Sequence, residues 1–247
     1  MTELEGQRIA VVGASRGLGR GVALALADAG ASVLALARSA PGLAGLDAAN
    51  VKARAADAAD PASVAHLHED DPPDAVVLVA GARPALGPLG SYEWEAFLRP
   101  FEVDAKATFH WLKAALRHAP PPSRVVVFSS GAALHGSPLS GGYAPAKQAQ
   151  RFLCQYARLE AQERGLDLRI QCILPQLNPN TGLGRAGVRA YASRAGETEE
   201  EFVRKRFGET PLGPAAAGAA LVELLGSPVH DGAAELMLTG DGLRAIA

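Results

Sequence analysis

Short apolar runs and longer amphipathic stretches alternate along most of the chain. The apolar runs predict strands at 8–12, 32–37, 51–55, 75–79, 125–127, 168–174 and 235–238. Apolar residues at helical spacing predict helices up to 30, from 61 onward, and at 92–98, 102–118, 143–164 and 214–225. Strands separated by such helices are typical of parallel βαβ units with right-handed crossovers. The pattern therefore predicts an α/β fold, a doubly wound parallel sheet of about seven strands with helices on both faces.

The segment at about 176–210 departs from this alternation, because it is polar and contains glycines. We predict that it forms a mobile lid over the site. The chain has 247 residues, 48% of them hydrophobic, and can therefore bury a large core. Residues 1–247 are expected to form a single domain that carries this lid.

A glycine-rich turn lies between the first predicted strand and the first predicted helix. Gly13, Gly17 and Gly19 allow a tight turn and a close approach of the backbone to a pyrophosphate. The helix that follows would present free amide groups to the anion at its N-terminus. A helix-capping turn fits the same three glycines, but their place in a first βαβ unit favours a nucleotide site.

A tyrosine and a lysine four positions apart provide a candidate acid-base pair. Tyr143 and Lys147 share one face of the helix predicted at 143–164, so the ammonium can favour the ionised phenol. A tyrosine with a reference pKa near ~10 needs this help to act as a base at neutral pH. Ser130 follows the strand predicted at 125–127 and can hold a substrate oxygen.

These features together resemble the short-chain dehydrogenase/reductase family, whose first turn has the spacing G-x-x-x-G-x-G. Ser130, Tyr143 and Lys147 match that family's catalytic residues in type and spacing. The resemblance implies a Rossmann-type fold and an oxidoreductase that interconverts a carbonyl and an alcohol on a small organic substrate. Tyr143 would transfer the proton, Lys147 would contact the nicotinamide ribose, and Ser130 would bind the substrate oxygen. It also implies a homotetramer or a homodimer.

The resemblance also implies a set of cofactor contacts. They are Gly13, Ser15, Arg16, Gly17, Leu18, Gly19, Arg38, Asp57, Ala80, Gly81, Tyr143, Lys147, Pro175 and Thr181. NAD-selective relatives commonly have an acidic residue where this chain has Ala37. Guanidinium groups at Arg16 and Arg38 would instead pair with a 2′-phosphate, which favours NADP, although two solvated surface arginines are the alternative.

Three parts of the chain depart from the family pattern. Asp104 stands where relatives usually have an asparagine that holds a water in a proton relay to the lysine. It could accept from that water, stabilise the Lys147 ammonium, or mark a drifted site. Where many relatives have two asparagines in the fourth-strand motif, this chain has Leu78 and Val79, and after the sixth strand the family's Pro-Gly becomes Pro175-Gln176. These departures motivate the rival hypothesis of a nonenzymatic NADP-binding redox sensor or scaffold.

Composition limits the classes of binding partner and the cellular compartments that we expect for this protein. A formal net charge of −2 leaves no basic excess for a nucleic-acid backbone. Charges or prolines interrupt every apolar run before about 18 residues, and the first residues lack an apolar core of signal-peptide length. With Cys154 and Cys172 expected as buried thiols, we predict a cytoplasmic protein without a membrane span. His66 and His68 point to different faces of a helix, so no metal site is expected.

Overall fold

The computed structural model describes residues 4–46, 50–70, 72–179, 181–207 and 211–246. In this part of the chain eight strands form one sheet in the order β3-β2-β1-β4-β5-β6-β7-β8. The strands are β1 (Arg8–Val12), β2 (Ser32–Ala37), β3 (Val51–Ala55), β4 (Ala75–Leu78), β5 (Ser123–Phe128), β6 (Leu168–Pro175), β7 (Glu235–Thr239) and β8 (Gly242–Ala245). All neighbours pair in parallel except β7 and β8. The predicted α/β fold with a doubly wound parallel sheet is confirmed.

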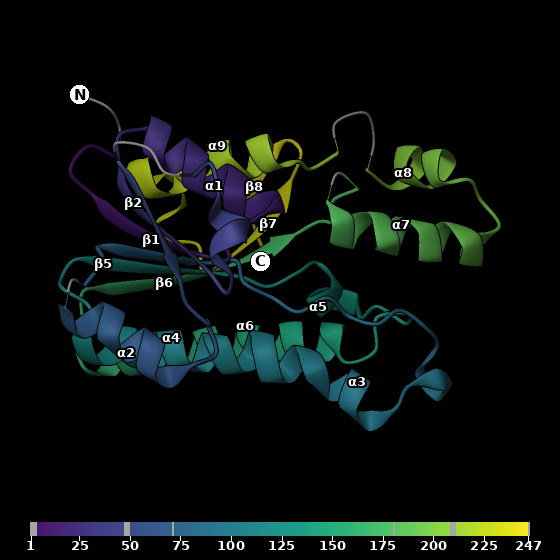
Figure 1. Ribbon diagram of the computed structural model, residues 1–247, viewed down its shortest axis with the longest axis horizontal. Helices are drawn as coiled ribbons and strands as arrows, with labels where there is room; N and C mark the ends of the chain where they lie inside the picture. The colour runs from purple at the N-terminus through teal and green to yellow at the C-terminus, as the bar shows by residue number, and fades with distance from the viewer. Residues whose placement is uncertain (1–3, 47–49, 71, 180, 208–210, 247) are drawn as a thin grey trace.

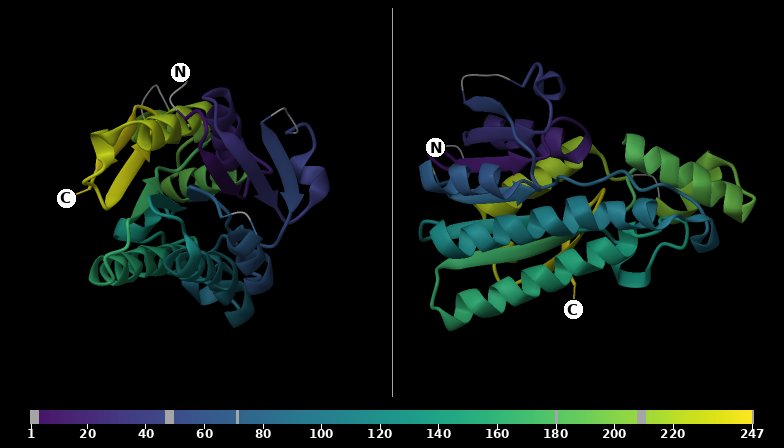
Figure 2. Two further views of the ribbon diagram at one scale, coloured as in Figure 1. Left: turned by 90° about the vertical axis from the view of Figure 1, so that its left-hand side faces the viewer. Right: turned by 60° about the horizontal axis from the view of Figure 1, so that its bottom comes forward.

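Helices cover both faces of this sheet, as Figures 1 and 2 show. They are α1 (Gly17–Asp28), α2 (Pro61–Asp70), α3 (Trp94–Pro100), α4 (Lys106–His118), α5 (Ala132–His135), α6 (Tyr143–Glu163), α7 (Gly182–Ala195), α8 (Glu199–Phe207) and α9 (Pro214–Gly226). Single 3₁₀ turns occur at η1 (Ala40–Leu43), η2 (Leu89–Ser91) and η4 (Pro228–His230). One buried apolar cluster joins the sheet to α1 and α9, and a second joins the other face to α2, α4 and α6. The burial of strands on both faces explains why they read as continuous apolar runs.

The strand order reverses between β1 and β4, which is where ligands bind in open parallel sheets. Chain segments leaving β1 and β2 are tied together there, because the amides of Gly13 and Ala14 both donate to Leu36 O. On the other side, the amides of Val79 and Ala80 both donate to Val12 O at 2.8 Å. The carboxyl ends of the central strands therefore form one continuous rim.

Two predicted helices proved to be one helical stretch. The sequence predicted a break between 98 and 102, whereas α3 runs directly into a π-helical turn, η3 (Phe101–Ala105), and then into α4. Pro100 lacks an amide donor, and a widened turn lets a helix continue past the missing bond. This correction matters because η3 carries Asp104.

The end of the chain and the predicted lid also differ in detail from the sequence-based expectation. An eighth strand, β8, was missed; the chain turns back at Gly242, which has a φ of +108°, and pairs antiparallel with β7. The segment at 176–210 contains the helical hairpin α7–α8, which projects beyond the sheet in Figure 1. A small cluster centred on Val188, Ala192 and Phe202 packs the two helices together. The polar segment therefore contains two helices, and its role as a mobile lid stays a prediction.

Candidate active site

The glycine turn after β1 has a shape that only glycine permits. Gly13 has a φ of +99°, and a Cβ there would lie 2.6 Å from Ala80 N. A Cβ on Gly19 would lie 2.2 Å from Gly13 O, so α1 presses directly on the turn. Arg16 precedes α1 in an extended conformation and gives the helix no side-chain cap. The amides at the start of α1 thus remain available to an anion, and the turn fits a dinucleotide pyrophosphate.

Other predicted cofactor residues lie along the same rim. Arg16 and Arg38 are exposed, and neither guanidinium has a polar partner among the residues that the structure describes. Ser15 and Leu18 are half-buried in the turn and first turn of α1. Asp57 is exposed after β3, and its Oδ1 accepts from Ala59 N at 2.9 Å. The structure therefore places the residues expected to recognise the adenosine half at the ends of β1, β2 and β3.

The segment after β4 connects the cofactor rim to the acid-base residues. The backbone of Ala80 meets Gly13, and a Cβ on Gly81 would lie 3.1 Å from Asp104 Oδ2. Leu78, which replaces a polar residue of the family pattern, is fully buried in the apolar cluster between the sheet and α2, α4 and α6. The loss of polar side chains here is therefore compensated by apolar packing, while the small residues keep the backbone close to both sites.

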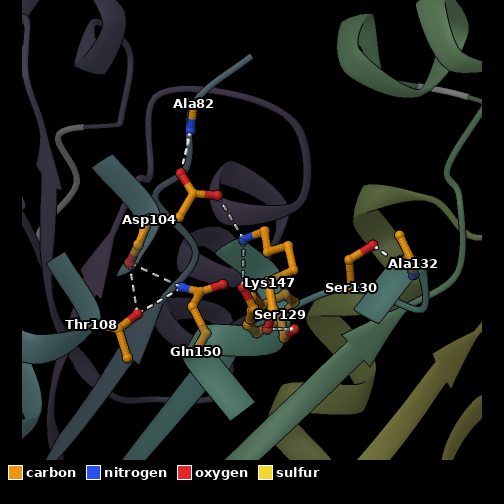
Figure 3. Close-up of polar contacts among 9 residues, drawn as sticks. Ala82, Asp104, Thr108, Ser129, Ser130, Ala132, Lys147 and Gln150 are labelled. Carbon is orange, nitrogen blue, oxygen red and sulfur yellow. Dashed lines mark hydrogen bonds and ion pairs between the residues drawn. The ribbon is translucent and has the colours of Figure 1, made fainter. Parts of the chain in front are cut away.

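Lys147 lies at the centre of the candidate active site and is almost completely buried (Figure 3). Its Nζ donates to Phe128 O at 3.0 Å and lies 3.1 Å from Asp104 Oδ2. Nζ is also 5.6 Å from the centroid of the Tyr143 ring. Burial lowers the pKa of Lys147, but the charges of Asp104 and Tyr143 raise it, and the net pKa lies above its ordinary value of 10.5. Lys147 is thus held as a buried cation beside the phenol.

Asp104 uses both carboxylate oxygens in this arrangement. Oδ1 accepts from Ala82 N at 2.6 Å, and Oδ2 faces Lys147. An asparagine has one acceptor oxygen and one donor nitrogen, so it could satisfy only one of these two donors. Among the roles considered for Asp104, this geometry therefore favours direct stabilisation of the Lys147 ammonium.

The main chain of Asp104 is held by two residues that the sequence analysis missed. Gln150 Nε2 donates to Asp104 O at 3.3 Å and to Thr108 Oγ1 at 2.6 Å, and Thr108 Oγ1 donates to Asp104 O at 2.9 Å. All three residues are fully buried. Gln150 lies one turn after Lys147 on the same helix face, and Thr108 lies one turn after Asp104. That spacing was the available signal for a clamp between η3 and α6.

Ser130 and Tyr143 complete the predicted catalytic set. Ser130 lies just after β5, is half-buried, and its Oγ accepts from Ala132 N at 3.2 Å. Its hydroxyl proton is unused within the described chain, so it can be donated to a ligand. Tyr143 is the first residue of α6 and is half-buried, with its amide donating to Ser140 O. In Figure 3 Ser130 lies to the right of Lys147, with its hydroxyl directed toward Ala132.

The predicted contacts from the second half of the chain are also near the rim. Pro175 ends β6, and its carbonyl accepts from Gly131 N at 2.9 Å, next to Ser130. Thr181 caps α7, its Oγ1 accepting from Gly184 N at 3.1 Å. A Cβ on Gly17 would lie 3.3 Å from Thr181 Cγ2, so the start of α7 touches the glycine turn. Thr181 therefore lies at the rim where the resemblance placed it as a cofactor contact.

Several other expectations concern residues away from this site. Cys154 and Cys172 are buried and unlinked, and the hydrogen bond between their thiols, together with burial, raises the pKa of Cys154. The side chains of His66 and His68 lie outside the described residues. Elsewhere in the described chain, no three His, Cys, Asp or Glu side chains are grouped as metal ligands. The described helices include none with the length and apolar character needed to cross a membrane.

Comparison with known proteins connects this geometry to a family. The family profile described as short chain dehydrogenase matches residues 7–191, which include the glycine turn, Asp104, Ser130, Tyr143 and Lys147. The chain belongs to the short-chain dehydrogenase/reductase family. Members of this family are NAD(P)-dependent oxidoreductases, and this chain is such an oxidoreductase.

Curated and solved relatives extend over nearly the whole chain. A short-chain type dehydrogenase/reductase of Picea abies is 30% identical over 249 residues, covering 90% of this chain and 86% of that protein. An uncharacterized oxidoreductase of Listeria monocytogenes is 27% identical over 219 residues, covering 82% and 85%. The structure of levodione reductase superposes with a TM-score of 0.78 at 21% identity, covering 96% and 97%. NAD⁺-bound xylitol dehydrogenase superposes with a TM-score of 0.81 at 20% identity, covering 96% and 99%. At such identities the two structures support the short-chain dehydrogenase/reductase fold alone.

Proposed function

We propose that this member of the family is an NADP-dependent oxidoreductase that interconverts a carbonyl and an alcohol on a small organic substrate. The observation that carries the proposal is the buried Lys147 ammonium, held by Asp104 and placed 5.6 Å from the Tyr143 ring. A buried cation beside a phenol is a costly arrangement that acid-base chemistry explains. Residues 1–247 would act as one dinucleotide-binding unit, with 176–210 as the substrate lid.

The cofactor would lie along the rim from β3 to Ser130. The glycine turn would hold its pyrophosphate, and Asp57, Ala80, Gly81, Pro175 and Thr181 would line the rest of its path. When bound, the nicotinamide supplies or accepts a hydride at the substrate carbon. The neighbouring side chains are left to bind the substrate oxygen and to move one proton.

Three side chains would perform that proton transfer. In the reductive direction Tyr143 donates its phenolic proton to the substrate oxygen, and in the oxidative direction it takes the proton back. Lys147 stabilises the phenolate electrostatically, because its charge lies close by in a water-poor environment. Ser130 donates its free hydroxyl proton to the same oxygen. Asp104 keeps Lys147 cationic and so acts through it.

The choice of NADP over NAD rests on two arginines. Arg38 follows β2, Arg16 lies in the glycine turn, and both are exposed without polar partners in the described chain. The family position that selects for NAD by a carboxylate is Ala37 here, which is buried and uncharged. A 2′-phosphate at this rim would meet positive charge on both sides and no repulsion.

We expect Arg38→Ala to weaken NADPH binding by about tenfold to a hundredfold, because a charge-assisted hydrogen bond contributes roughly 1.5–3 kcal/mol. NADH affinity should stay within about twofold, since NADH has no 2′-phosphate for the guanidinium to bind. Titration of each nucleotide by fluorescence measures both constants. Arg117→Ala, an exposed arginine in the last turn of α4, is the matched control for loss of charge. Equal losses of NADPH and NADH would refute the assignment.

The proposed activity is tested by following NADPH absorbance with the purified chain over a panel of aldehydes and ketones. The expected result is saturable oxidation of NADPH with at least one carbonyl compound. Nucleotide binding without turnover on a broad panel would instead favour the rival, a redox sensor or scaffold. Binding and turnover are therefore measured on the same preparation.

A homodimer or homotetramer is the proposed assembly, and α4 and α6 offer the surface for it. These helices pack together, and Phe109, Phe152, Tyr156 and Leu159 are between 46% and 61% exposed on them. Exposed large apolar side chains on adjoining helices are typical of a contact surface. We expect light scattering to give a mass of two or four chains, and Leu159→Asp to shift it toward one. A monomeric wild type would contradict the proposal.

A cytoplasmic location remains a prediction, supported by the two buried thiols.

A further inference from the structure

The phenol of Tyr191 joins the helical hairpin α7–α8 to the loop that leads into Tyr143. Tyr191, on α7, is half-buried, and its ring stacks on Phe202 of α8 with centroids 6.5 Å apart. The hydroxyl accepts from Leu139 N at 3.1 Å and shares a hydrogen bond with Ser137 Oγ at 2.6 Å. The residues it contacts belong to the loop between α5 and α6, which leads into Tyr143.

Hydrogen bonds within that loop connect Ser137 to Tyr143. Ser140, which is buried, donates from both its amide and its hydroxyl to Ser137 O at 2.9 Å. Tyr143 N in turn donates to Ser140 O at 3.0 Å. These bonds connect Ser137, through Ser140, to the amide of the first residue of α6.

The carbonyl group of Leu139 is held by the loop after β4. Leu139 O accepts from Gly87 N at 2.9 Å and lies 3.2 Å from the hydroxyl of Tyr92. The N–H and C=O of Leu139 are thus bound from two directions, and Tyr191 provides the partner on the α7 side. Removal of its hydroxyl would leave the Leu139 amide without that partner.

The other end of α7 lies at the glycine turn. Thr181, which caps α7, is within contact distance of Gly17, and Tyr191 is ten residues later, about 15 Å along the helix. One rigid helix therefore extends from the turn that would hold the pyrophosphate to the loop that carries Tyr143. Within the described residues, no carboxylate, lysine or arginine forms a hydrogen bond with the Tyr191 hydroxyl, whose partners are Ser137 and Leu139.

We propose that Tyr191 is a positioning residue, whose phenol ties α7 to the loop at 137–140 and so determines where Tyr143 enters the active site. The inference deepens the proposed function and rests on it for its kinetic test only. The contact between hairpin and loop is tested separately, without substrate or nucleotide.

The first test is amide hydrogen exchange of Tyr191→Phe, resolved to single residues by mass spectrometry. We expect exchange at Leu139 to rise about fivefold to tenfold, the effect of one lost hydrogen bond. Amides of β1 should be unchanged. Tyr156→Phe, which removes the hydroxyl of a residue of α6 that is 61% exposed, is the matched control and should leave Leu139 protected. Unchanged exchange at Leu139 in the Tyr191 variant would overturn the proposal.

The second test separates positioning from a merely structural role. With a substrate found in the carbonyl panel, kcat of Tyr191→Phe should fall about fivefold while its pH profile keeps the wild-type shape. Faster exchange with an unchanged kcat would overturn the positioning role. If the wild type has no activity, the proposed function fails and the exchange result alone decides the contact. Ser137→Ala removes the second partner of the phenol, and it replaces Tyr191→Phe if that variant does not fold.

Discussion

Tyr143→Phe is expected to lower kcat by about a hundredfold to ten-thousandfold, the range typical for loss of a general acid or base. The substitution removes one hydroxyl and keeps the ring that lies 5.6 Å from Lys147 Nζ. Binding of NADPH should stay within about twofold, because the pyrophosphate turn and the arginines are untouched. Steady-state kinetics with NADPH and titration of the nucleotide measure the two effects separately.

Tyr156→Phe is the control for this substitution, since its ring is on the outer face of α6. It should have wild-type kcat. A Tyr143→Phe variant as active as the wild type would show that the proton comes from elsewhere. Loss of NADPH binding along with turnover would show instead that the phenol contributes mainly to the cofactor site.

Asp104→Asn is expected to reduce the free energy of unfolding by about 3–5 kcal/mol, the usual effect of breaking a buried ion pair. Asn has the size of Asp but only one acceptor, so it cannot serve both Ala82 N and Lys147 Nζ. The Asp104→Asn/Lys147→Met double variant should be more stable than Asp104→Asn, because no uncompensated charge remains. Chemical denaturation of the wild type, Asp104→Asn, Lys147→Met and the double variant gives the coupling directly. Additive effects would contradict a direct Asp104–Lys147 interaction.

The pH dependence of stability should change sign in the same variant. In the wild type the pKa of Lys147 is raised above 10.5 in the folded state. Its stabilising contribution is therefore fully present below the unfolded pKa and is lost as pH rises through the folded pKa. Without Asp104, burial would lower that pKa, so the variant should gain stability as pH rises toward 10.5. Parallel pH profiles of wild type and variant would contradict this account.

The sequence predicted the parts of the fold that depend on periodicity and glycine. The apolar runs located seven strands because the sheet is buried on both faces, and the glycine turn was recognisable from its position between β1 and α1. β8 was missed because a short edge strand after a turn has no buried run. The π-helical turn at Asp104 was missed because Pro100, which lacks an amide donor, is compatible both with a helix break and with a widened turn.

The sequence indicated candidate residues for the site but not the contacts among them. Ser130, Tyr143 and Lys147 follow from their types and spacing, whereas the role of Asp104 stayed open between a water relay, a direct ion pair and a drifted site. The distance of 3.1 Å to Lys147 Nζ and the second bond to Ala82 N are tertiary facts. Spacing could place Thr108 one turn after Asp104 and Gln150 one turn after Lys147. The bonds from Gln150 to Asp104 and Thr108, and from Tyr191 to the loop at 137–140, join segments distant in sequence, which local patterns do not record.

The central claim is hydride transfer between a nicotinamide and a carbonyl carbon at this site. It is tested most directly by incubating the wild-type chain with NADPH deuterated at the transferable C4 position and a carbonyl compound that it turns over. Mass spectrometry of the alcohol should find one deuterium bound to the carbinol carbon, and Tyr143→Phe should form this product far more slowly. NADPH binding without any deuterated alcohol across the carbonyl panel would contradict the claim.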